Sequence, residues 1–589
     1  MLLSNMNRLF LIVSLLFVLV ALSKSATGQA LVNEPDYLRE YDRNSLTVLM
    51  LDYNSRHNNY GSCLRKAMYK LAVPSKFDNN MLSTRVVNSA DNSDNIRQAL
   101  ESSKIPNDIF SKWFSRGADG SFNMSVIHER GLYNATDADV IEASASKVGL
   151  AKLQDAGESL IGRSYVMVLS FRNIKTMEQY YDELDANRKS VADLFNTKYI
   201  PVARTKNGYR ADVVGYIYKL SNLSASMDDF YSNMWIFDED SKEDRSRKIN
   251  AFDNANFNLE YVTTVIRTVE ASQLNVGQQK SQEDLFVDLA NASVEGLVYE
   301  SEAKVEAWKV VTALYDTHPL RAKIGTKENL NVDDRYFVYE YRMNKDNQVY
   351  ADRRGVVRVK KVASNSQVAQ GQSDNDAQQM SSFYQVAGHR LEPGMFMEQN
   401  NDRGLGVTFG YATGAQSGVF INIEAMANNG ISNTTQLKGF LAGHIDFGNY
   451  NLNDCGLFQY DSDLEDASFC FFGGEFGFSK GFFPLRNVAL SAHGGFAIEF
   501  ADFAKTDLSK EYFEGGMVDC LFSFVGVQMA INLKYNVQLI GGMNYYVQLE
   551  NAMLTKKNDE DEKSLGVTYS SMFDGRVGAN INLGVRIQF

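Results

Sequence analysis

The last twelve residues of the chain, 578–589 (GANINLGVRIQF), alternate strictly between two kinds of side chain. One row is apolar and consists of Ala579, Ile581, Leu583, Val585, Ile587 and Phe589. The other row is polar or small and consists of Asn580, Asn582, Gly584, Arg586 and Gln588. Neighbouring side chains on a β-strand point to opposite faces of the sheet. The segment therefore predicts a strand with one apolar face and one polar face.

The same period of two returns in seven further segments upstream. Their apolar rows lie within residues 405–411, 419–423, 437–447, 472–478, 488–500, 521–533 and 537–547. The connections after the second, fourth and sixth segments (426–436, 481–487, 534–536) are shorter than those after the third, fifth and seventh (448–468, 501–519, 550–576). Short turns at one end and long loops at the other are typical of a barrel that crosses a bilayer, where closure satisfies every backbone group. We expect an eight-stranded antiparallel barrel over residues 403–589.

These strands and the terminal Phe589 resemble bacterial eight-stranded outer-membrane β-barrels of the OmpA type. The resemblance implies a transmembrane barrel in the cell outer membrane of a Gram-negative cell. It also implies that Phe589 is part of the signal read by the barrel-insertion machinery, and that this machinery and the outer-membrane lipids are partners. Phe589 is expected at the periplasmic face, on the same side as the region before residue 400.

The N-terminus supports export. Residues 1–30 are predicted to be a signal peptide, with Arg8 before an apolar run (9–22) and small residues at the cleavage site ending at Ala30. No other stretch has about eighteen consecutive apolar residues, the length that a transmembrane helix needs.

Residues 31–315 are predicted to be a periplasmic α/β or α+β region. Apolar runs predict strands at 45–51, 165–171, 211–220 and 258–268, and helical spacing predicts a helix after Thr136-Asp137 and a long one over 281–314. The order of the strands in the sheet does not follow from the sequence. The succession of elements resembles the periplasmic modules of surface-structure assembly proteins of the curli-secretion and flagellar-accessory type.

Residues 316–398 are predicted to be a small antiparallel β domain. Its strands lie near 336–341, 355–362 and 383–395, and a polar stretch (364–379) interrupts them. The arrangement resembles an SH3-like barrel. The alternative is a plain β linker domain stacked on the membrane barrel.

The polar face of the barrel strands should point inward, because eight strands leave an interior that side chains fill. We expect a buried polar network of Lys438, His444, Glu475, His493, Glu499 and Arg586. Charges of both signs occur in it, as a buried network requires. The alternative is catalysis by His493 with Ser491 or Glu499, or by His444 with Asp446, since these pairs share a face.

Other sequence features restrict the chemistry. The four cysteines (Cys63, Cys455, Cys470, Cys520) allow a Cys455–Cys470 or Cys455–Cys520 disulfide between external loops, or free buried thiols. They form no C-x-x-C pair, and we expect no catalytic residues, no metal and no cofactor. A formal net charge of -13 argues against nucleic acid as a partner.

The sequence therefore predicts a non-enzymatic outer-membrane protein. Its barrel would anchor a periplasmic interaction domain that binds an unidentified envelope protein, in envelope organisation or in assembly or secretion of a surface structure. The alternatives are a barrel enzyme that hydrolyses lipid or peptide, and a small-solute transport or pore protein.

Overall fold

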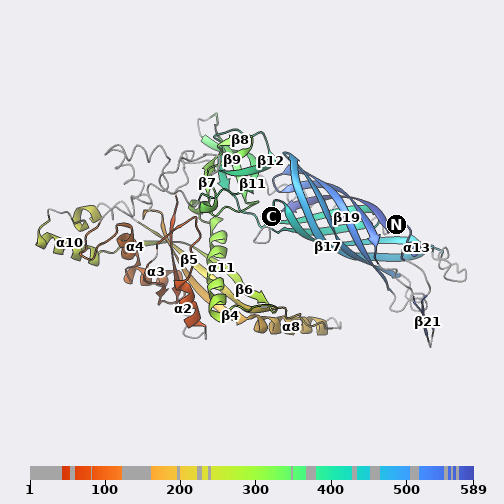
Figure 1. Cartoon of the computed structure of the whole chain (residues 1–589), viewed down its shortest axis with the longest axis horizontal. Helices are drawn as coiled ribbons and strands as arrows, with labels where there is room; N and C mark the ends of the chain where they lie inside the picture. Colours follow the sequence, from red (N-terminus) through yellow and green to blue (C-terminus); the bar gives the residue numbers. More distant parts are fainter. Residues whose placement is uncertain are drawn as a thin grey trace. The chain divides into compact units, whose positions relative to one another are not determined.

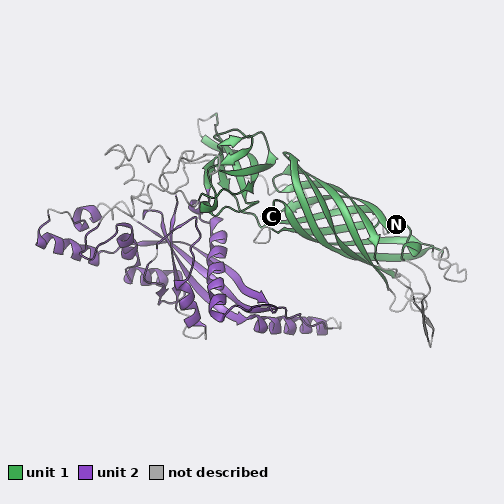
Figure 2. Cartoon of the chain, viewed as in Figure 1, with its two compact units in different colours: residues 1–38, 311–589 green, residues 39–310 purple. Residues whose placement is uncertain are grey.

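The computed structural model divides into two compact units (Figure 2). In chain order, we call residues 39–310 the first unit (purple, unit 2 in the key) and residues 1–38 with 311–589 the second unit (green, unit 1 in the key). The described residues are 43–52, 60–80, 82–122, 161–194, 199–221, 229–236, 240–345, 349–365, 380–427, 434–451, 465–503, 517–549, 555–558, 561–564 and 569–589. The predicted signal peptide and the helix predicted after Thr136 lie outside this part of the chain. We describe each unit by itself.

The first unit is built on a mixed β-sheet (Figure 1). Its strand order is β2-β1-β4-β5-β6, with β3 also paired to β1. β1 runs parallel to β4, whereas β4, β5 and β6 form an antiparallel meander. The strands are β1 (Ser45–Leu51), β2 (Asp78–Asn79), β3 (Val86–Val87), β4 (Ser164–Thr176), β5 (Lys206–Leu220) and β6 (Leu259–Leu274).

Helices cover both faces of this sheet, which explains its continuous apolar runs. Leu49 and Leu51 pack with residues of α3, α4 and α10 on one face. Leu46, Val48 and Met50 pack with residues of α2 and α11 on the other. Every residue of β1 is buried, as its unbroken apolar sequence predicts for a strand covered on both sides. The helices are α2 (Gly61–Tyr69), α3 (Ser93–Ser102), α4 (Ile105–Trp113), α8 (Met177–Leu194), α10 (Lys242–Asn254) and α11 (Gln282–Glu302), with shorter turns η3 (Phe230–Met234) and η4 (Glu306–Trp308).

The helix predicted over 281–314 is shorter in the structure. It begins after Ser281, whose side chain caps the Asp284 amide, and ends at Glu302. Trp308 lies in η4 and packs edge-on against Phe77 and Tyr165. Burial of this indole requires the chain to turn back toward the sheet, so packing overrides the local helical pattern.

A cluster around Asp91 ties the start of α3 to the sheet. The Asp91 carboxylate accepts hydrogen bonds from Ser170, Arg172 and Tyr216. Burial raises the pKa of Asp91, but the hydrogen bonds from Arg172, Ser170 and Tyr216 outweigh it and hold the pKa below its ordinary value. The ionised carboxylate therefore stabilises the folded unit.

In the second unit, a small antiparallel sheet precedes the barrel. Its strand order is β7-β13-β10-β11-β12-β9-β8, and the chain enters it at Val311. The predicted small β domain is present, and the SH3-like comparison stays a prediction. The strands are β7 (Val311–Ala313), β8 (Asp316–Thr317), β9 (Leu320–Ala322), β10 (Arg335–Met343), β11 (Val349–Lys361), β12 (Ser381–Gly388) and β13 (Phe396–Gln399), with a 3-10 turn η5 (Thr326–Glu328).

The predicted C-terminal barrel is confirmed. Eight strands pair in sequence order, and β23 pairs with β14 to close the ring (Figure 1). They are β14 (Leu405–Gly414), β15 (Gly418–Met426), β16 (Leu437–Tyr450), β17 (Ala467–Leu485), β18 (Val488–Phe503), β19 (Met517–Lys534), β20 (Val537–Gln548) and β23 (Gly578–Gln588). The connection between β20 and β23 contains β21 (Thr555–Asn558), β22 (Asp561–Ser564) and α13 (Tyr569–Met572). We call the end with connections 427–436, 486–487 and 535–536 the turn end, and the opposite end the loop end.

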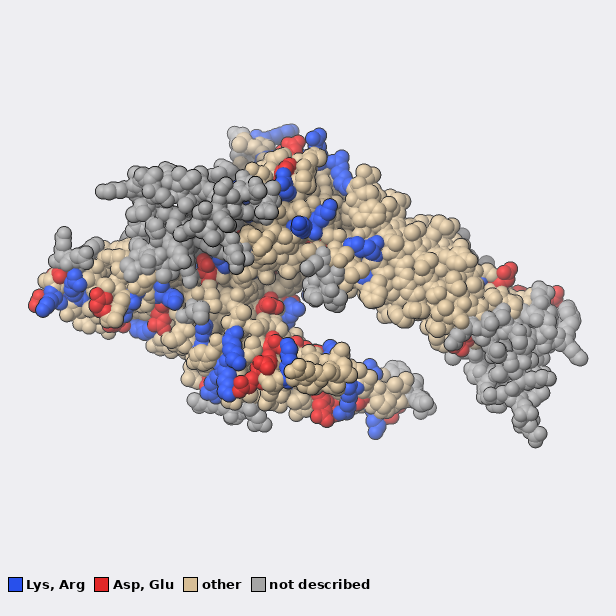
Figure 3. All heavy atoms as spheres, in the orientation of Figure 1, with Lys and Arg blue, Asp and Glu red and all other residues tan. Residues whose placement is uncertain are grey.

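The barrel exterior is apolar. Leu441, Phe476, Val525 and Leu583 are each more than half exposed, and they come from four different strands. Figure 3 shows a barrel face without charged side chains in its middle. Such a belt on a closed barrel is the surface of a transmembrane barrel.

Two residues predicted on this face, Val537 and Ile587, are instead buried side by side at the turn end. In the described part of the chain, no helix is long and apolar enough to span a membrane.

The small β domain is fixed to the turn end of the barrel by hydrogen bonds. Asn487, in the β17–β18 turn, donates from its side chain to the Gly388 carbonyl and accepts from the Gly388 amide. The Asp333 carboxylate accepts from the backbone amide of Gln436 at 2.7 Å, and the Gln436 side chain donates to Tyr384. The two parts therefore form one compact body.

Buried charges reinforce this attachment. Asp402, in the segment that leads into β14, forms ion pairs with Arg335 (3.1 Å) and Arg358. All three side chains are at most 9% exposed. One carboxylate thus bridges two guanidinium groups of adjacent strands β10 and β11.

We expect Asp91→Asn to destabilise the first unit by about 1–2 kcal/mol at pH 7, because a partly screened charge-assisted hydrogen-bond cluster is lost. The folded-state pKa of Asp91 is depressed, so its contribution is present above the unfolded pKa and is lost as the pH falls through the folded pKa. The difference in the free energy of unfolding between wild type and variant should therefore become smaller in acid. Tryptophan fluorescence during urea unfolding measures it, since Trp113, Trp235 and Trp308 all lie in this unit. If this difference in unfolding free energy does not change with pH, the ionised Asp91 carboxylate does not stabilise the first unit. Glu178→Gln, an exposed carboxylate on α8, is the control.

We expect Asp402→Asn to cost about 3 kcal/mol, because it leaves two buried arginines without a full counter-charge. Hydrogen–deuterium exchange in β10 and β11 should accelerate about 100-fold, since 1.4 kcal/mol is a factor of ten. Asp352→Asn, at a half-exposed carboxylate of the same sheet, should cost less than about 1 kcal/mol. Equal exchange rates in the two variants would show that the Asp402 ion pairs do not reinforce the attachment of the small β domain to the barrel.

Candidate functional site

The barrel lumen holds two layers of paired charged side chains. Near the turn end, Glu424 forms ion pairs with Lys438 at 2.6 Å and with Arg586 at 3.0 Å. Arg586 also donates to Thr408 and Gln528. These residues belong to strands β14, β15, β16, β19 and β23, so the layer links strands around the barrel.

A second charged layer lies nearer the loop end and is centred on Glu499, which is fully buried. Its carboxylate receives hydrogen bonds from Arg576, Tyr569 and Gln416 and contacts His444 Nε2 at 2.9 Å. Because Glu499 accepts all of these bonds, His444 Nε2 acts as a donor toward it.

The connection between β20 and β23 supplies the core of this layer. Arg576 lies 3.0 Å from Asp446 and stacks over the Phe471 ring at 3.9 Å. Phe573 and Tyr569 are fully buried and pack against each other, and Phe573 also packs against Phe469. We call residues 569–576 the loop-end plug, since their side chains fill the barrel there.

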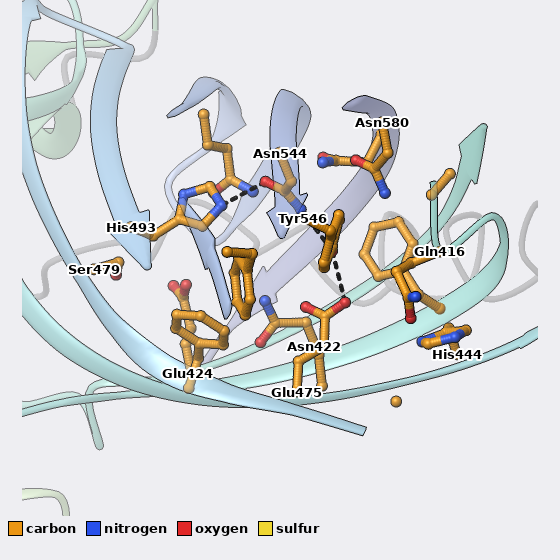
Figure 4. A pocket seen from close by; sticks show the side chains of 18 of the residues that line it. Gln416, Asn422, Glu424, His444, Glu475, Ser479, His493, Asn544, Tyr546 and Asn580 are labelled. Carbon is orange, nitrogen blue, oxygen red and sulfur yellow. Dashed lines mark hydrogen bonds between the residues drawn. The ribbon is translucent and has the colours of Figure 1, made fainter. Parts of the chain in front are cut away.

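Between the two layers lies a cavity of about 60 Å³ (Figure 4). It is lined by side chains from both layers and by Asn422, Glu475, His493 and Asn544. Two glycines make room for its imidazoles. A Cβ at Gly473 would lie 2.4 Å from His444 Cε1, and one at Gly526 would lie 2.5 Å from His493 Nε2. The glycine content of these strands thus reflects close packing inside the barrel.

A directional hydrogen-bond chain crosses the cavity wall (Figure 4). His493 Nε2 lies 2.7 Å from Asn544 Oδ1, and Asn544 Nδ2 donates to the Tyr546 hydroxyl. Tyr546 in turn donates to Glu475 at 2.7 Å. The amide of Asn544 faces Tyr546 with its donor, so its oxygen faces His493 and the His493 Nε2 carries the proton. Glu475 is the final acceptor.

The structure places all six residues of the predicted network on the lumen side. It divides them among three groups: Lys438 and Arg586 with Glu424, His444 with Glu499, and His493 with Glu475 through the chain. The predicted network did not include Glu424, Asp446 or Tyr546, although their alternating positions mark them as inward-facing. Arg576 follows no periodic pattern because it lies in a loop, and its role depends on tertiary structure alone.

The histidines do not contact the partners that the catalytic alternative needs. His444 is bonded to Glu499, and the carboxylate of Asp446 is bonded to Arg576 and Ser417. His493 is bonded to Asn544. Within the described ranges, no group of three or more His, Cys, Asp or Glu side chains has the arrangement of a metal site. Cys63, Cys470 and Cys520 form no disulfide with one another, and Cys455 lies outside the described residues.

We expect Glu499→Gln to destabilise the folded barrel by about 3–5 kcal/mol, because Arg576 would lose the fully buried one of its two carboxylate partners and His444 would lose its ionised acceptor. Urea titration followed by heat-modifiable gel mobility measures this. Asp519→Asn changes an exposed carboxylate of the same barrel and should shift stability by no more than about 0.5 kcal/mol. Unchanged stability in Glu499→Gln would contradict the assigned role of this carboxylate.

No protein-family model matches the sequence, and no curated protein matches it. Among solved structures, the chain is similar to the N-terminal β-barrel domain of OprF from Pseudomonas aeruginosa, at 10% identity over 32% of this chain and 100% of that chain, with a TM-score of 0.19. It is also similar to Neisserial surface protein A, at 13% identity over 32% of this chain and 100% of that one (TM-score 0.19). A major outer membrane protein of Thermus thermophilus matches at 15% identity over 31% of this chain and 98% of that one (TM-score 0.22). The eight-stranded barrel assignment itself rests on the strand pairing of this chain.

Proposed function

We propose that the protein is a non-enzymatic outer-membrane protein whose barrel anchors an interaction unit, residues 39–310, in the periplasm. The partner of that unit is a protein of the cell envelope, and the process is envelope organisation or assembly or secretion of a surface structure. Outer-membrane lipids surround the barrel, and the barrel-insertion machinery places it there.

The observation that carries this proposal is the filled lumen. A pore needs a continuous open path, whereas here two layers of paired charges and the loop-end plug occupy the barrel on either side of the cavity. An enzyme needs a nucleophile or base that faces its substrate, whereas Glu424 and Glu499 are held by cations and both histidines are bonded to other lumen residues. The lumen contacts therefore favour an anchor over the pore and hydrolase alternatives.

The first unit supports a role in protein binding. In the described part of the chain, β6 pairs only with β5, so its outer edge is available to another strand. α11 covers the face of β6 that carries Val265 and Val269. On the other face Ile266 is 67% exposed, and Leu274 near the strand end is 57% exposed. An unpaired edge beside exposed apolar side chains is a surface that suits an extended protein segment.

The attachment of the small β domain supports the anchoring role. Its hydrogen bonds and the Asp402 ion pairs fix this domain to the turn end of the barrel. Residues 39–310 continue directly into it at Val310–Val311. A load on the interaction unit would therefore be transmitted to a firmly held domain before it reaches the membrane.

The test is cross-linking in native outer membranes followed by purification of the full chain. We expect a discrete envelope protein to co-purify with wild type, and Ile266→Glu to reduce its yield at least tenfold, because the charge would have to be desolvated at the interface. Tyr69→Glu is the matched control, since Tyr69 is 66% exposed on α2 in the same unit. Its partner yield should equal that of wild type.

The alternatives give different results in the same material. If the partner is retained by a chain that lacks residues 39–310, the interaction resides in the second unit and the proposal is wrong. If His444→Ala abolishes a hydrolytic activity of the folded protein on lipid or peptide, the enzyme alternative replaces it.

A further inference from the structure

We propose that the lumen cavity binds a monovalent metal cation, sodium or potassium, with Glu475 as its charged ligand. Among the described residues, the lumen contains more carboxylates than permanently charged cations. Four carboxylates face the lumen, of Glu424, Asp446, Glu475 and Glu499. Three permanent cations oppose them, the side chains of Lys438, Arg576 and Arg586. One negative charge is left.

Among the described residues, Glu475 is the one of these four carboxylates that has no cationic partner. Glu424 has Lys438 and Arg586 as cationic partners, whereas Asp446 and Glu499 share Arg576. Glu475 receives only the hydroxyl of Tyr546, a neutral donor. Because the chain from His493 donates toward Glu475, this residue is held as an acceptor, and its side chain lines the cavity. An uncompensated charge within a barrel is costly.

The same cavity also contains polar atoms that lack hydrogen-bond partners. Four buried atoms among its lining residues have no hydrogen-bond partner: Gln416 Oε1, Asn422 Oδ1, Asn580 Oδ1 and His444 Nδ1. Gln416, Asn580 and His444 are at most 8% exposed. Buried polar atoms are almost always paired, so four on one cavity indicate an occupant.

The chemistry of these atoms selects the occupant. The Gln416 side chain donates its amide to Glu499, so its free atom is the carbonyl oxygen. His444 Nε2 donates to Glu499, so a neutral His444 presents a lone pair at Nδ1. The set is therefore carboxylate, carbonyl and imidazole lone pairs (Figure 4).

Water, a proton and a metal cation differ in whether they satisfy these lone pairs and also neutralise the charge of Glu475. Water alone would pair with them but would leave the charge of Glu475 in place. A proton on Glu475 would remove the charge, but water would have to occupy the cavity beside it to satisfy the carbonyl oxygens. A cation satisfies both demands. Hard cations take oxygen ligands, and one carboxylate with neutral carbonyls provides a single negative charge, which suits a monovalent ion better than calcium or magnesium. The cavity of about 60 Å³ has room for the ion with water.

The test is equilibrium binding of ²²Na⁺ and ⁸⁶Rb⁺, the latter as a potassium analogue, to the folded full chain in detergent, with choline chloride keeping the ionic strength constant. We expect about one ion per chain for one of the two. Glu475→Gln should weaken binding at least tenfold, and Asn580→Ala should weaken it several-fold with the charge retained. Glu178→Gln, a mostly exposed carboxylate on α8, should bind as wild type does.

Heat-modifiable gel mobility verifies that each variant is folded, and Asn580→Ala serves as the deciding variant if Glu475→Gln does not fold. Binding that is equal in wild type, Glu475→Gln and Asn580→Ala would show an adventitious ion and overturn the site. No binding to wild type, together with an infrared carboxylic-acid band that Glu475→Gln removes, would show a proton in place of the cation and would overturn it as well.

Discussion

A strand in a transmembrane barrel has a lipid side and a lumen side, and this constraint governs the second unit. Every second side chain must be apolar, so the polar residues of eight strands are concentrated in one narrow interior. Desolvated charges there are stable only when they are paired. Glu424 and Glu499 meet this requirement near opposite ends of the lumen, each with cationic partners from other strands or from the loop-end plug. Glu475, between them, has no cationic partner among the described residues, and the cation that we propose in the cavity would supply one.

The same constraint explains which parts of the fold were predictable. Period-two alternation located all eight barrel strands, and the unbroken apolar run at β1 showed a strand buried on both faces. The local sequence pattern did not predict the features that depend on tertiary packing. The long helix ends at Glu302 because Trp308 turns back into the core, and Val537 and Ile587 are buried at the turn end.

The lumen was predictable as a set of inward-facing residues but not as a set of contacts. The six candidate residues face inward because strands alternate. Their partners depend on strand register, which pairs His444 with Glu499 on a strand that is not adjacent to its own. Arg576 could not be found from sequence, because a loop has no period that fixes the direction of its side chains. The Asp402 ion pairs were likewise missed, since they join strands of the small β domain to the segment before the barrel.

In the described part of the chain, the second unit is a transmembrane barrel with two charged layers in its lumen and a β domain bonded to its turn end, and in the first unit β6 pairs only with β5. Steady conductance in planar lipid bilayers tests the filled lumen most directly. The account predicts that the folded wild-type protein gives no steady conductance above the bare bilayer in sodium or potassium chloride. A stable single-channel current carried by the wild-type chain, absent with heat-unfolded protein, would contradict it.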